Sequence, residues 1–434
     1  MPIPFLPNLL FNYAAKQKDA GNITRALRLY TLSMAFSFDD PAYKCHILFR
    51  RGDCFLEIGQ IEAAIANFSA ILTTARATDE LRAHALIGLG RSWQCKQEFS
   101  TAISEYTALI EMPNAPAHLH RQAYFGRAAC WSARGYGPSA ICDYSAIIET
   151  PTYAVYFRAH ALAFRAQCWR EQDQIQKAVA DETALLEMPA TSENLKFDAL
   201  CRRAPDLYRC AEFTAAQADL TRILDFPSNS ASTKAWALLA RGHCALRLNN
   251  DDAAIADYGA VIGMPDALPE HKFDALKYRI QILSDQKNLA AVLSDLDILF
   301  ALPGLSSAQK ANALCERAQV FGQQEIWEAG IEDYTQVLAL PDLSLEITTY
   351  ALAGRGYFLT AQGRSLEAIS DLTQVIETPN VPAEILGTAL INRGECSARL
   401  ENNAAALLDY ETLLSMPEAS EEMKTETLRL KAEL

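Results

Sequence analysis

The sequence lacks any run of 18 or more apolar residues, so no membrane-spanning helix is expected. Its 11 cysteines include no Cys-x-x-Cys pair, which argues against a disulfide framework or a zinc site and favours a reduced, cytoplasmic setting. The first seven residues, Met-Pro-Ile-Pro-Phe-Leu-Pro, contain no basic side chain and do not resemble a signal peptide. Half of the 434 residues are hydrophobic, which excludes a disordered chain.

Motifs that carry catalysis are also missing. There is no Gly-rich phosphate loop of the P-loop or dinucleotide type and no His-Glu-x-x-His. Close helix packing accounts for Gly88-Leu-Gly90. The sequence shows no further metal ligands that would complete a site with the pair His118-Leu-His120. Five cysteines at one repeated position are expected to be small core residues rather than nucleophiles: Cys54, Cys130, Cys168, Cys244 and Cys396. We therefore expect no enzymatic activity, no cofactor and no bound metal.

Negative charge is concentrated in the second half of the chain. Residues 1–217 hold 22 Lys+Arg and 22 Asp+Glu, whereas residues 218–434 hold 17 against 31, which accounts for the net charge of −14. Nucleic-acid binding depends on cationic side chains that neutralise phosphates. An acidic half argues against a nucleic-acid partner.

A period of 38 residues runs through the sequence. Prolines keep this step at Pro113, Pro151, Pro189, Pro227, Pro265, Pro303, Pro341, Pro379 and Pro417. Arginines keep it at Arg127, Arg165, Arg203, Arg241, Arg279, Arg317, Arg355 and Arg393, and an aspartate follows each of them 16 residues later. The period predicts eleven repeats over residues 4–421, without insertion or deletion, followed by a tail at 422–434.

Each repeat is predicted to be a pair of helices. In residues 232–269, the apolar positions Leu238, Gly242, Ala245 and Leu246 form one helical stripe, and a second stripe with the same spacing begins at Ala254. A glycine or asparagine lies between the stripes in several repeats, where a left-handed residue would end the first helix. The periodic proline ends the second helix. Because neither helix can bury its stripe alone, the pairs are expected to stack into an all-α solenoid.

The order of small residue, aromatic, alanine, Tyr or Phe, and proline resembles the tetratricopeptide repeat (TPR). Trp93, Trp131 and Trp169 occupy its first aromatic place, and Tyr106 and Tyr144 are among those at its second. The resemblance covers nearly the whole chain, but the period is 38 rather than the usual 34, and the Arg and Asp rows lie outside the family's common pattern. It implies a right-handed superhelix of eleven helix-turn-helix repeats, with residues 422–434 as a C-terminal capping helix or the start of a truncated twelfth repeat.

The arginine and aspartate rows are interpreted mainly as structural ion pairs, since the two rows match in number; an anion-binding arginine ladder is the alternative. Pairs between repeats, 22 residues apart, are favoured because this spacing places the uncharged Asn67 opposite the uncharged Leu89 and leaves only Arg51, opposite Leu29, without an acid. Examples are Glu105–Arg127 and Asp257–Arg279, and the series ends with Asp409–Lys431. Such pairs are expected to be partly buried and bidentate, and to fix the stacking register.

The resemblance also implies that the first helix of each pair lines a concave groove. On this basis the positions five before and two after the periodic arginine position supply most of the candidate partner-binding residues, and Arg170 is added to them: His46, His84, Arg91, Gln122, His160, Gln167, Arg170, Trp236 and His243. The rows continue through Asp274, Gln281, Asn312, Gln319, Tyr350 and Tyr357. Variable polar residues on a rigid scaffold suit peptide recognition, although the same rows would suit a solvated face.

The most consistent function is a non-enzymatic scaffold or adaptor that binds protein or peptide partners through this groove. The alternative is a sensor or recruitment domain of a larger signalling protein whose effector domain lies beyond the C-terminus. Pro205, in the middle of a first helix, marks either a degenerate repeat or a hinge between two arms of the solenoid. The sequence does not indicate an oligomeric state.

Overall fold

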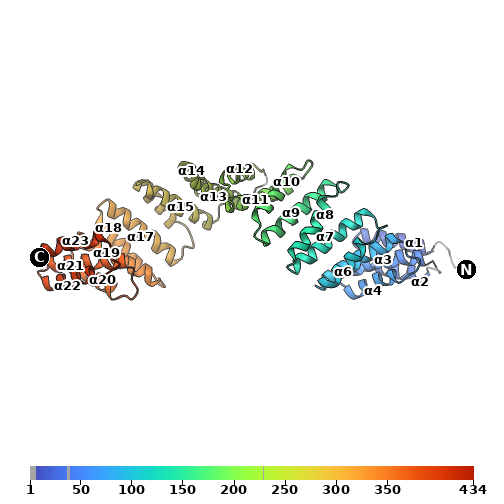
Figure 1. Ribbon diagram of the computed structural model, residues 1–434, viewed down its shortest axis with the longest axis horizontal. Helices are drawn as coiled ribbons and strands as arrows, with labels where there is room; N and C mark the ends of the chain where they lie inside the picture. The colour runs from blue at the N-terminus through green and yellow to red at the C-terminus, as the bar shows by residue number, and fades with distance from the viewer. Residues whose placement is uncertain (1–5, 37–39, 228) are drawn as a thin grey trace. The chain divides into compact units, whose positions relative to one another are not determined.

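The computed structural model describes residues 6–36, 40–227 and 229–434, and every regular element in these ranges is a helix. The predicted start of the repeats at residue 4 lies outside the described residues. The chain divides into two compact units, Met1–Phe226 and Pro227–Leu434, each with its own internal packing. Helices α1–α12 belong to the first unit and α13–α23 to the second (Figure 1). The all-α solenoid is therefore confirmed.

The helices of the first unit are α1 (Leu6–Asp19), α2 (Ile23–Phe36), α3 (Pro41–Glu57), α4 (Ile61–Leu72), α5 (Asp79–Cys95), α6 (Phe99–Ile110), α7 (Ala117–Ala133), α8 (Gly137–Ile148), α9 (Val155–Glu171), α10 (Ile175–Glu187), α11 (Glu193–Arg209) and α12 (Phe213–Leu224). Those of the second are α13 (Ala231–Arg247), α14 (Asp251–Gly263), α15 (Pro269–Asp285), α16 (Leu289–Phe300), α17 (Ser307–Gln323), α18 (Trp327–Leu338), α19 (Leu345–Ala361), α20 (Ser365–Glu377), α21 (Ala383–Arg399), α22 (Asn403–Leu414) and α23 (Glu421–Ala432). From α3 onward the starts of the first helices keep the period of the sequence, and from α2 onward so do the starts of the second helices. None of the described helices is both long and apolar enough to cross a membrane.

The turn inside each helix pair has one left-handed residue, and this residue recurs with the period of the sequence. Glycine occupies it at Gly21, Gly59, Gly135 and Gly363, as the sequence predicts, and Asn249 does so with φ of 56°. The other six repeats place a less suited residue there: Gln97, Asp173, Ala211, Lys287, Glu325 and Glu401, with φ between 56° and 62°. The amide of the next residue then bonds back to the helix, as Asn250 N does to Ala245 O at 2.9 Å. The fold thus imposes the turn even where the residue opposes it.

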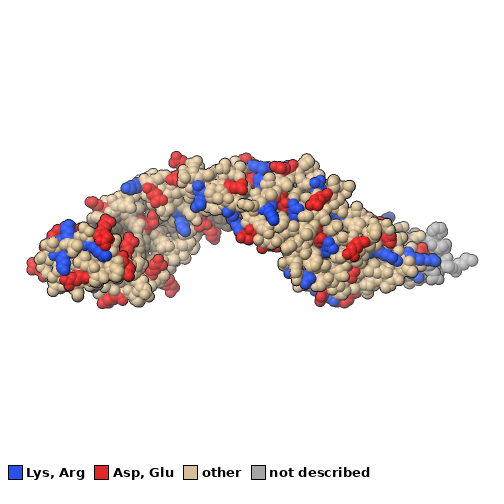
Figure 2. All heavy atoms as spheres, viewed as in Figure 1, with Lys and Arg blue, Asp and Glu red and all other residues tan. Residues whose placement is uncertain are grey.

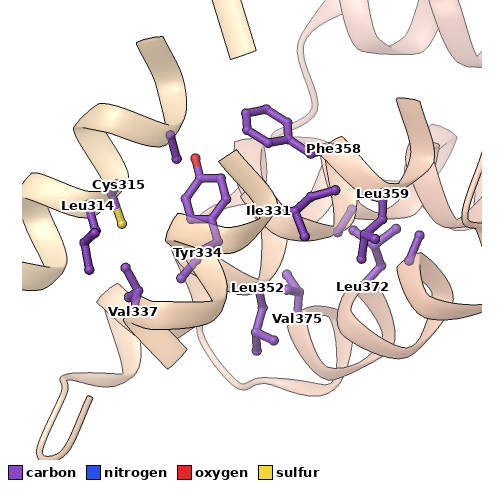
Figure 3. Packing of buried hydrophobic residues seen from close by; sticks show 14 of the residues in the cluster. Leu314, Cys315, Ile331, Tyr334, Val337, Leu352, Phe358, Leu359, Leu372 and Val375 are labelled. Atoms are coloured by element: carbon purple, nitrogen blue, oxygen red, sulfur yellow. The ribbon is translucent and has the colours of Figure 1, made fainter. Parts of the chain in front are cut away.

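An aromatic ring on the second helix packs between two first helices. The Tyr106 ring lies against Gly90 of its own repeat and Gly126 of the next, and a Cβ at either glycine would overlap the ring. Figure 3 shows the same arrangement around Tyr334 of α18, which lies between Leu314 and Cys315 of α17 and Phe358 of α19. The glycines Gly52, Gly242 and Gly394, each directly after a periodic arginine, likewise accommodate the rings of Phe68, Tyr258 and Tyr410.

The predicted pairing of arginine with the preceding repeat's acid is wrong. Arg127 Nε and Nη2 donate to the two carboxylate oxygens of Asp143 at 2.9 and 2.7 Å, within one repeat. The same pairing within a repeat holds for Arg165–Asp181, Arg203–Asp219, Arg241–Asp257, Arg279–Asp295, Arg317–Asp333, Arg355–Asp371 and Arg393–Asp409. The reason is geometric: the left-handed turn residue Gly135 lies midway between Arg127 and Asp143, and residues equidistant from a helical-hairpin turn lie side by side. The expectation of partly buried, bidentate pairs is confirmed.

The arginine still links two repeats, but through a hydroxyl. Arg127 Nη1 donates to Thr107 of the preceding repeat at 2.9 Å, 20 residues earlier. Arg165 reaches Ser145 and Arg203 reaches Thr183 in the same way, at 2.8 and 2.7 Å. On each second helix the aspartate and the hydroxyl residue lie two positions apart, as Asp143 and Ser145 do on α8, so their side chains point in nearly opposite directions. One side chain faces its own repeat and the other faces the next.

The basic residues at the two ends of the row, Arg51 and Lys431, also pair differently from the prediction. Arg51 Nε donates to Asn67 Oδ1 at 2.6 Å, within its own repeat. Lys431 Nζ contacts Glu411 at 2.8 Å rather than Asp409, which is bound to Arg393. Arg51 thus keeps the spacing of the arginine–aspartate pairs within a repeat, and Lys431 keeps the spacing of the arginine–hydroxyl bonds between repeats.

Pro205 lies inside α11 and does not end it. The helix runs on to Arg209, although Pro205 supplies no amide hydrogen for the bond to Cys201 O. The division into compact units follows Phe226, so it comes after the sixth helix pair, α11 and α12, rather than at Pro205.

Candidate partner-binding surface

The first helices of neighbouring repeats pack against one another. In the first unit α3 contacts α5 and α5 contacts α7, and in the second unit α17 contacts α19 and α19 contacts α21. Hydrogen bonds join them, as from Gln94 Nε2 on α5 to Gly126 O on α7 at 3.2 Å. Successive second helices show no contact of comparable extent within the described ranges. The first helices therefore form a shared face in each unit, which we call the first-helix face.

The predicted residues of the first unit lie on its first helices with differing exposure. The exposed side chains are His46 of α3, Arg91 of α5, Gln122 of α7 and Gln167 of α9. His84 and His160 are half-buried. The Gln167 amide donates to Glu171 on its own helix at 3.1 Å, and so remains on the surface.

The two half-buried histidines have aromatic neighbours. The His84 ring lies 4.9 Å from Phe49 of α3 and 6.2 Å from His118 of α7. The His160 ring lies 4.4 Å from Tyr156, one turn away on α9. Burial lowers the pKa of both imidazoles, and the positive charge of Arg202 lowers that of His160 further. Both rings are thus held toward the neutral form.

Arg170 lies in a buried cluster of charges. Its Nε contacts Asp206 of α11 at 2.6 Å, and its Nη2 contacts Glu182 of α10 at 2.9 Å. Arg202 Nε also contacts Glu182 at 2.7 Å, and the Glu182 side chain is completely buried. The cluster links α9, α10 and α11 beside Pro205. The chain's own carboxylates neutralise Arg170, and contact with a partner stays a prediction for this residue.

In the second unit, Trp236 and His243 lie half-buried on α13. The His243 ring is 4.5 Å from the Tyr278 ring of α15, and Tyr278 stacks on the buried Tyr258 with centroids 5.9 Å apart. Among the residues that the structure describes, no hydrogen-bond partner faces the buried Nε2 atom of His243. Burial lowers the pKa of this imidazole, although Asp274 opposes the shift.

A first cleft of about 350 Å³ opens between α15 and α17 of the second unit. Its apolar walls include Ile280, Leu296 and Leu299, each at most 5% exposed. Leu296 and Leu299 come from the second helix α16, so the cleft reaches down between the two first helices. Gln281 and Asn312 are exposed at its polar edge.

A second cleft of about 350 Å³ follows between α17, α19 and α21. It shares Asn312 and Glu316 with the first cleft, so the two adjoin along the first-helix face. At its edge the Gln319 amide donates to the Tyr350 hydroxyl and joins α17 to α19. Burial raises the pKa of Tyr350, which keeps this hydroxyl protonated.

The residues lining both clefts are neutral or acidic except for one. Glu316 accepts a hydrogen bond from Ser284 Oγ at 3.2 Å, and Glu346 is exposed in the first turn of α19. Lys277 is the single cation lining either cleft within the described residues, and its Nζ lies 5.7 Å from the Tyr278 ring centroid. The second unit as a whole, residues 227–434, holds 16 Lys+Arg against 29 Asp+Glu. Figure 2 shows the two signs interspersed over the drawn face, with acidic side chains along the second unit.

The residues lining these clefts were not among the candidates singled out from the sequence. Gln281, Asn312, Gln319 and Tyr350 occupy the predicted rows, but nothing in the rows distinguishes them from the positions in other repeats. Lys277 and Glu316 lie outside the rows. A usable signal was the run of amide and tyrosine residues in successive repeats of the acidic half.

Within the described residues, no group of three His, Cys, Asp or Glu side chains is arranged to hold a metal ion. His120 Nε2 lies 3.1 Å from Met112 O, and His118 lies beside His84 instead. The two histidines of the His-Leu-His pair thus face different neighbours.

No protein-family model matches the sequence, and no curated protein matches it significantly. Among solved structures, the chain is similar to the C-terminal part of a TPR repeat-containing protein from Cytophaga hutchinsonii, with 14% identity, a TM-score of 0.49, and coverage of 61% of this chain and 98% of that one. A tetratricopeptide repeat protein from Parabacteroides merdae gives 16% identity and a TM-score of 0.39 over 62% of this chain and 97% of that one. The TPR domain of P58(IPK) gives 15% identity and a TM-score of 0.26 over 98% of each chain.

The chain's own geometry defines its architecture. Helices alternate in pairs at a constant interval, and a left-handed residue lies in the turn of each pair. In repeats such as that of Tyr106, an aromatic ring of the second helix lies against small residues of two first helices. The described residues form an all-α solenoid of stacked helix pairs.

Proposed function

We propose that this chain is a non-enzymatic scaffold that binds a segment of a protein partner along the first-helix face. The observation that carries the proposal is the pair of adjoining clefts on α15, α17, α19 and α21. An apolar floor with a few amide groups at its edge is the lining typical of sites that hold a ligand. Amide side chains can both donate to and accept from a peptide backbone.

Candidate residues of the first unit extend the proposal to a second contact region. Arg91, Gln122 and Gln167 are exposed on α5, α7 and α9 and are available to a partner. A partner that contacts both regions would gain affinity from being held at two places at once.

Site-specific photo-crosslinking tests the proposal. A benzophenone amino acid replaces Gln281 on the first-helix face, and in a matched variant it replaces Gln336, which is exposed on the second helix α18. In native lysate we expect the Gln281 position to crosslink one contiguous segment of a partner and the Gln336 position to crosslink no such segment. Equal crosslinking from both faces would show that the first-helix face has no special role. A parallel pair at Gln167 and at Gln176, exposed on α10, tests the first unit.

A further inference from the structure

The two adjoining clefts of the second unit differ in chemistry. Ile280, Leu296 and Leu299 make the floor of the first cleft apolar, and these residues are almost completely buried. The second cleft carries two carboxylates, Glu316 and Glu346, and no cation lines it among the described residues. An apolar side chain gains free energy in the first cleft, and a cationic side chain gains it in the second.

The charged groups near the clefts favour a cation over an anion. Lys277 lies at the first cleft and is directed over the Tyr278 ring, while Glu316 lines both clefts. Asp274 is exposed one helical turn before Tyr278 on α15 and adds a third carboxylate to the same helix face. The excess of acidic residues over the whole second unit would attract a basic partner and repel an acidic one.

The adjacency of the two clefts suits an extended peptide. In an extended chain, side chains two residues apart point to the same side and are separated by about 6.6 Å. Because the clefts share Asn312 and Glu316, they are direct neighbours, and consecutive same-side residues of an extended peptide can enter both. The shared Asn312 amide then faces the backbone between them.

We infer that the second unit selects an extended, basic peptide in which an apolar residue and a Lys or Arg lie two positions apart. The apolar side chain enters the cleft between α15 and α17, and the cation lies beside Glu316 and Glu346. This inference rests on the proposed function, since it specifies the partner of the same face.

The test uses fluorescent decapeptides with a Gly-Ser background and one central triplet: Leu-Ser-Lys, Leu-Ser-Glu, Leu-Ser-Ser or Ser-Ser-Lys. Fluorescence anisotropy measures their binding to the full chain. We expect Leu-Ser-Lys to bind about tenfold more tightly than Leu-Ser-Glu at low salt, and the difference to shrink as salt screens the charges. Ser-Ser-Lys, which lacks the apolar anchor, is expected to bind about tenfold more weakly than Leu-Ser-Lys.

Substitutions on the protein locate the effect. The double variant Glu316→Gln and Glu346→Gln should bind Leu-Ser-Lys and Leu-Ser-Ser equally, whereas Glu332→Gln, exposed on α18, should keep the preference. Gln281→Trp should block the first cleft and weaken the binding of all Leu peptides, whereas Gln336→Trp should leave it unchanged. Both pairs of variants change exposed or half-exposed side chains, and circular dichroism checks that each variant is folded.

The outcomes separate the two claims. Binding that Gln281→Trp blocks but that shows no preference for Lys over Glu would overturn the inference and leave the proposed function in place. Binding of no peptide, or binding that Gln281→Trp leaves unchanged, would overturn both for this unit.

Discussion

Arg393 is bound to Asp409 of its own repeat, through contacts of 3.0 and 2.6 Å, while Asp371 of the preceding repeat is bound to Arg355. The third donor of Arg393, Nη1, reaches Thr373 of the preceding repeat at 3.1 Å. One guanidinium therefore holds a helix pair together and also attaches it to its neighbour. At Arg393 the ion pair acts inside a repeat, and the neutral hydroxyl acts between repeats.

A double-mutant cycle separates the two pairings. Arg393→Ala is expected to lower the free energy of unfolding by about 3–5 kcal/mol, because the Asp409 carboxylate is left buried without its partner. In urea denaturation, Arg393→Ala and Asp409→Ala should be strongly non-additive, by about 1 kcal/mol or more. Arg393→Ala and Asp371→Ala should be close to additive. Coupling to Asp371 that exceeds coupling to Asp409 would contradict the observed pairing.

Glu105 offers the reverse case, since Leu89 takes the place of its arginine. Burial raises the pKa of the Glu105 carboxyl, so ionisation opposes folding as the pH rises through that pKa. We expect Glu105→Gln to stabilise the protein at pH 7 by up to about 1 kcal/mol and to have a smaller effect at pH 4. Burial also raises the pKa of Asp143, but Asp143→Asn takes the carboxylate partner from the half-buried Arg127 and should therefore destabilise the protein at pH 7. Urea denaturation at the two pH values measures both; a loss of stability in Glu105→Gln at pH 7 would count against this account.

Ala211 places a Cβ at the left-handed turn position, with φ of 61°. Because a Cβ is disfavoured in this conformation, Ala211→Gly is expected to stabilise the sixth repeat by about 1 kcal/mol. Ala180→Gly, at an exposed position inside α10, serves as the control and should destabilise by about 0.5–1 kcal/mol. Hydrogen exchange followed on peptides of α11 and α12 reads the effect locally. Slower exchange in Ala180→Gly than in Ala211→Gly would contradict the prediction.

Acid should destabilise the protein through its half-buried histidines. Burial lowers the pKa of His84, His160 and His243 from 6.5, so below pH 6.5 the unfolded chain binds more protons than the folded one. The free energy of unfolding should therefore fall as the pH drops from about 6.5 toward the lowered pKa values. In His243→Gln this fall should be smaller, and the exposed His46→Gln serves as the control. Thermal denaturation at pH 7.5 and pH 5.5 measures the difference, and equal shifts in both variants would exclude His243 as a source.

Periodicity predicted the helices because each repeat faces the same requirement. The prolines, the turn glycines and the apolar stripes are local signals, and the helix starts follow them at the same constant interval. The six turn residues other than glycine and asparagine show where local preference yields to packing: Ala211 and Lys287 adopt a left-handed φ because the helices on either side already fix the turn.

The partner of each arginine was not predictable from matching rows alone. The positions 16 after and 22 before each arginine are both acidic, and counting charges does not say which side of the second helix faces which neighbour. The position of the turn identifies the partner: Gly135 lies halfway between Arg127 and Asp143, and residues equidistant from the turn of a helix pair lie side by side. The clefts at Gln281 and Asn312 depend on how far apart neighbouring first helices stand, and that spacing follows from side-chain volumes in three dimensions.

Where the second helix carries a hydroxyl 20 residues before the periodic arginine, successive joints between repeats are interchangeable. Arg127 meets Thr107, and Arg165 meets Ser145, at the same offset along the chain and with nearly the same bond length. Excising one whole repeat directly after Thr107 would bring Arg165 to Thr107 with its donor and acceptor already matched. At such joints a whole repeat can be duplicated or excised, and the arginine–hydroxyl contact between neighbouring repeats is kept.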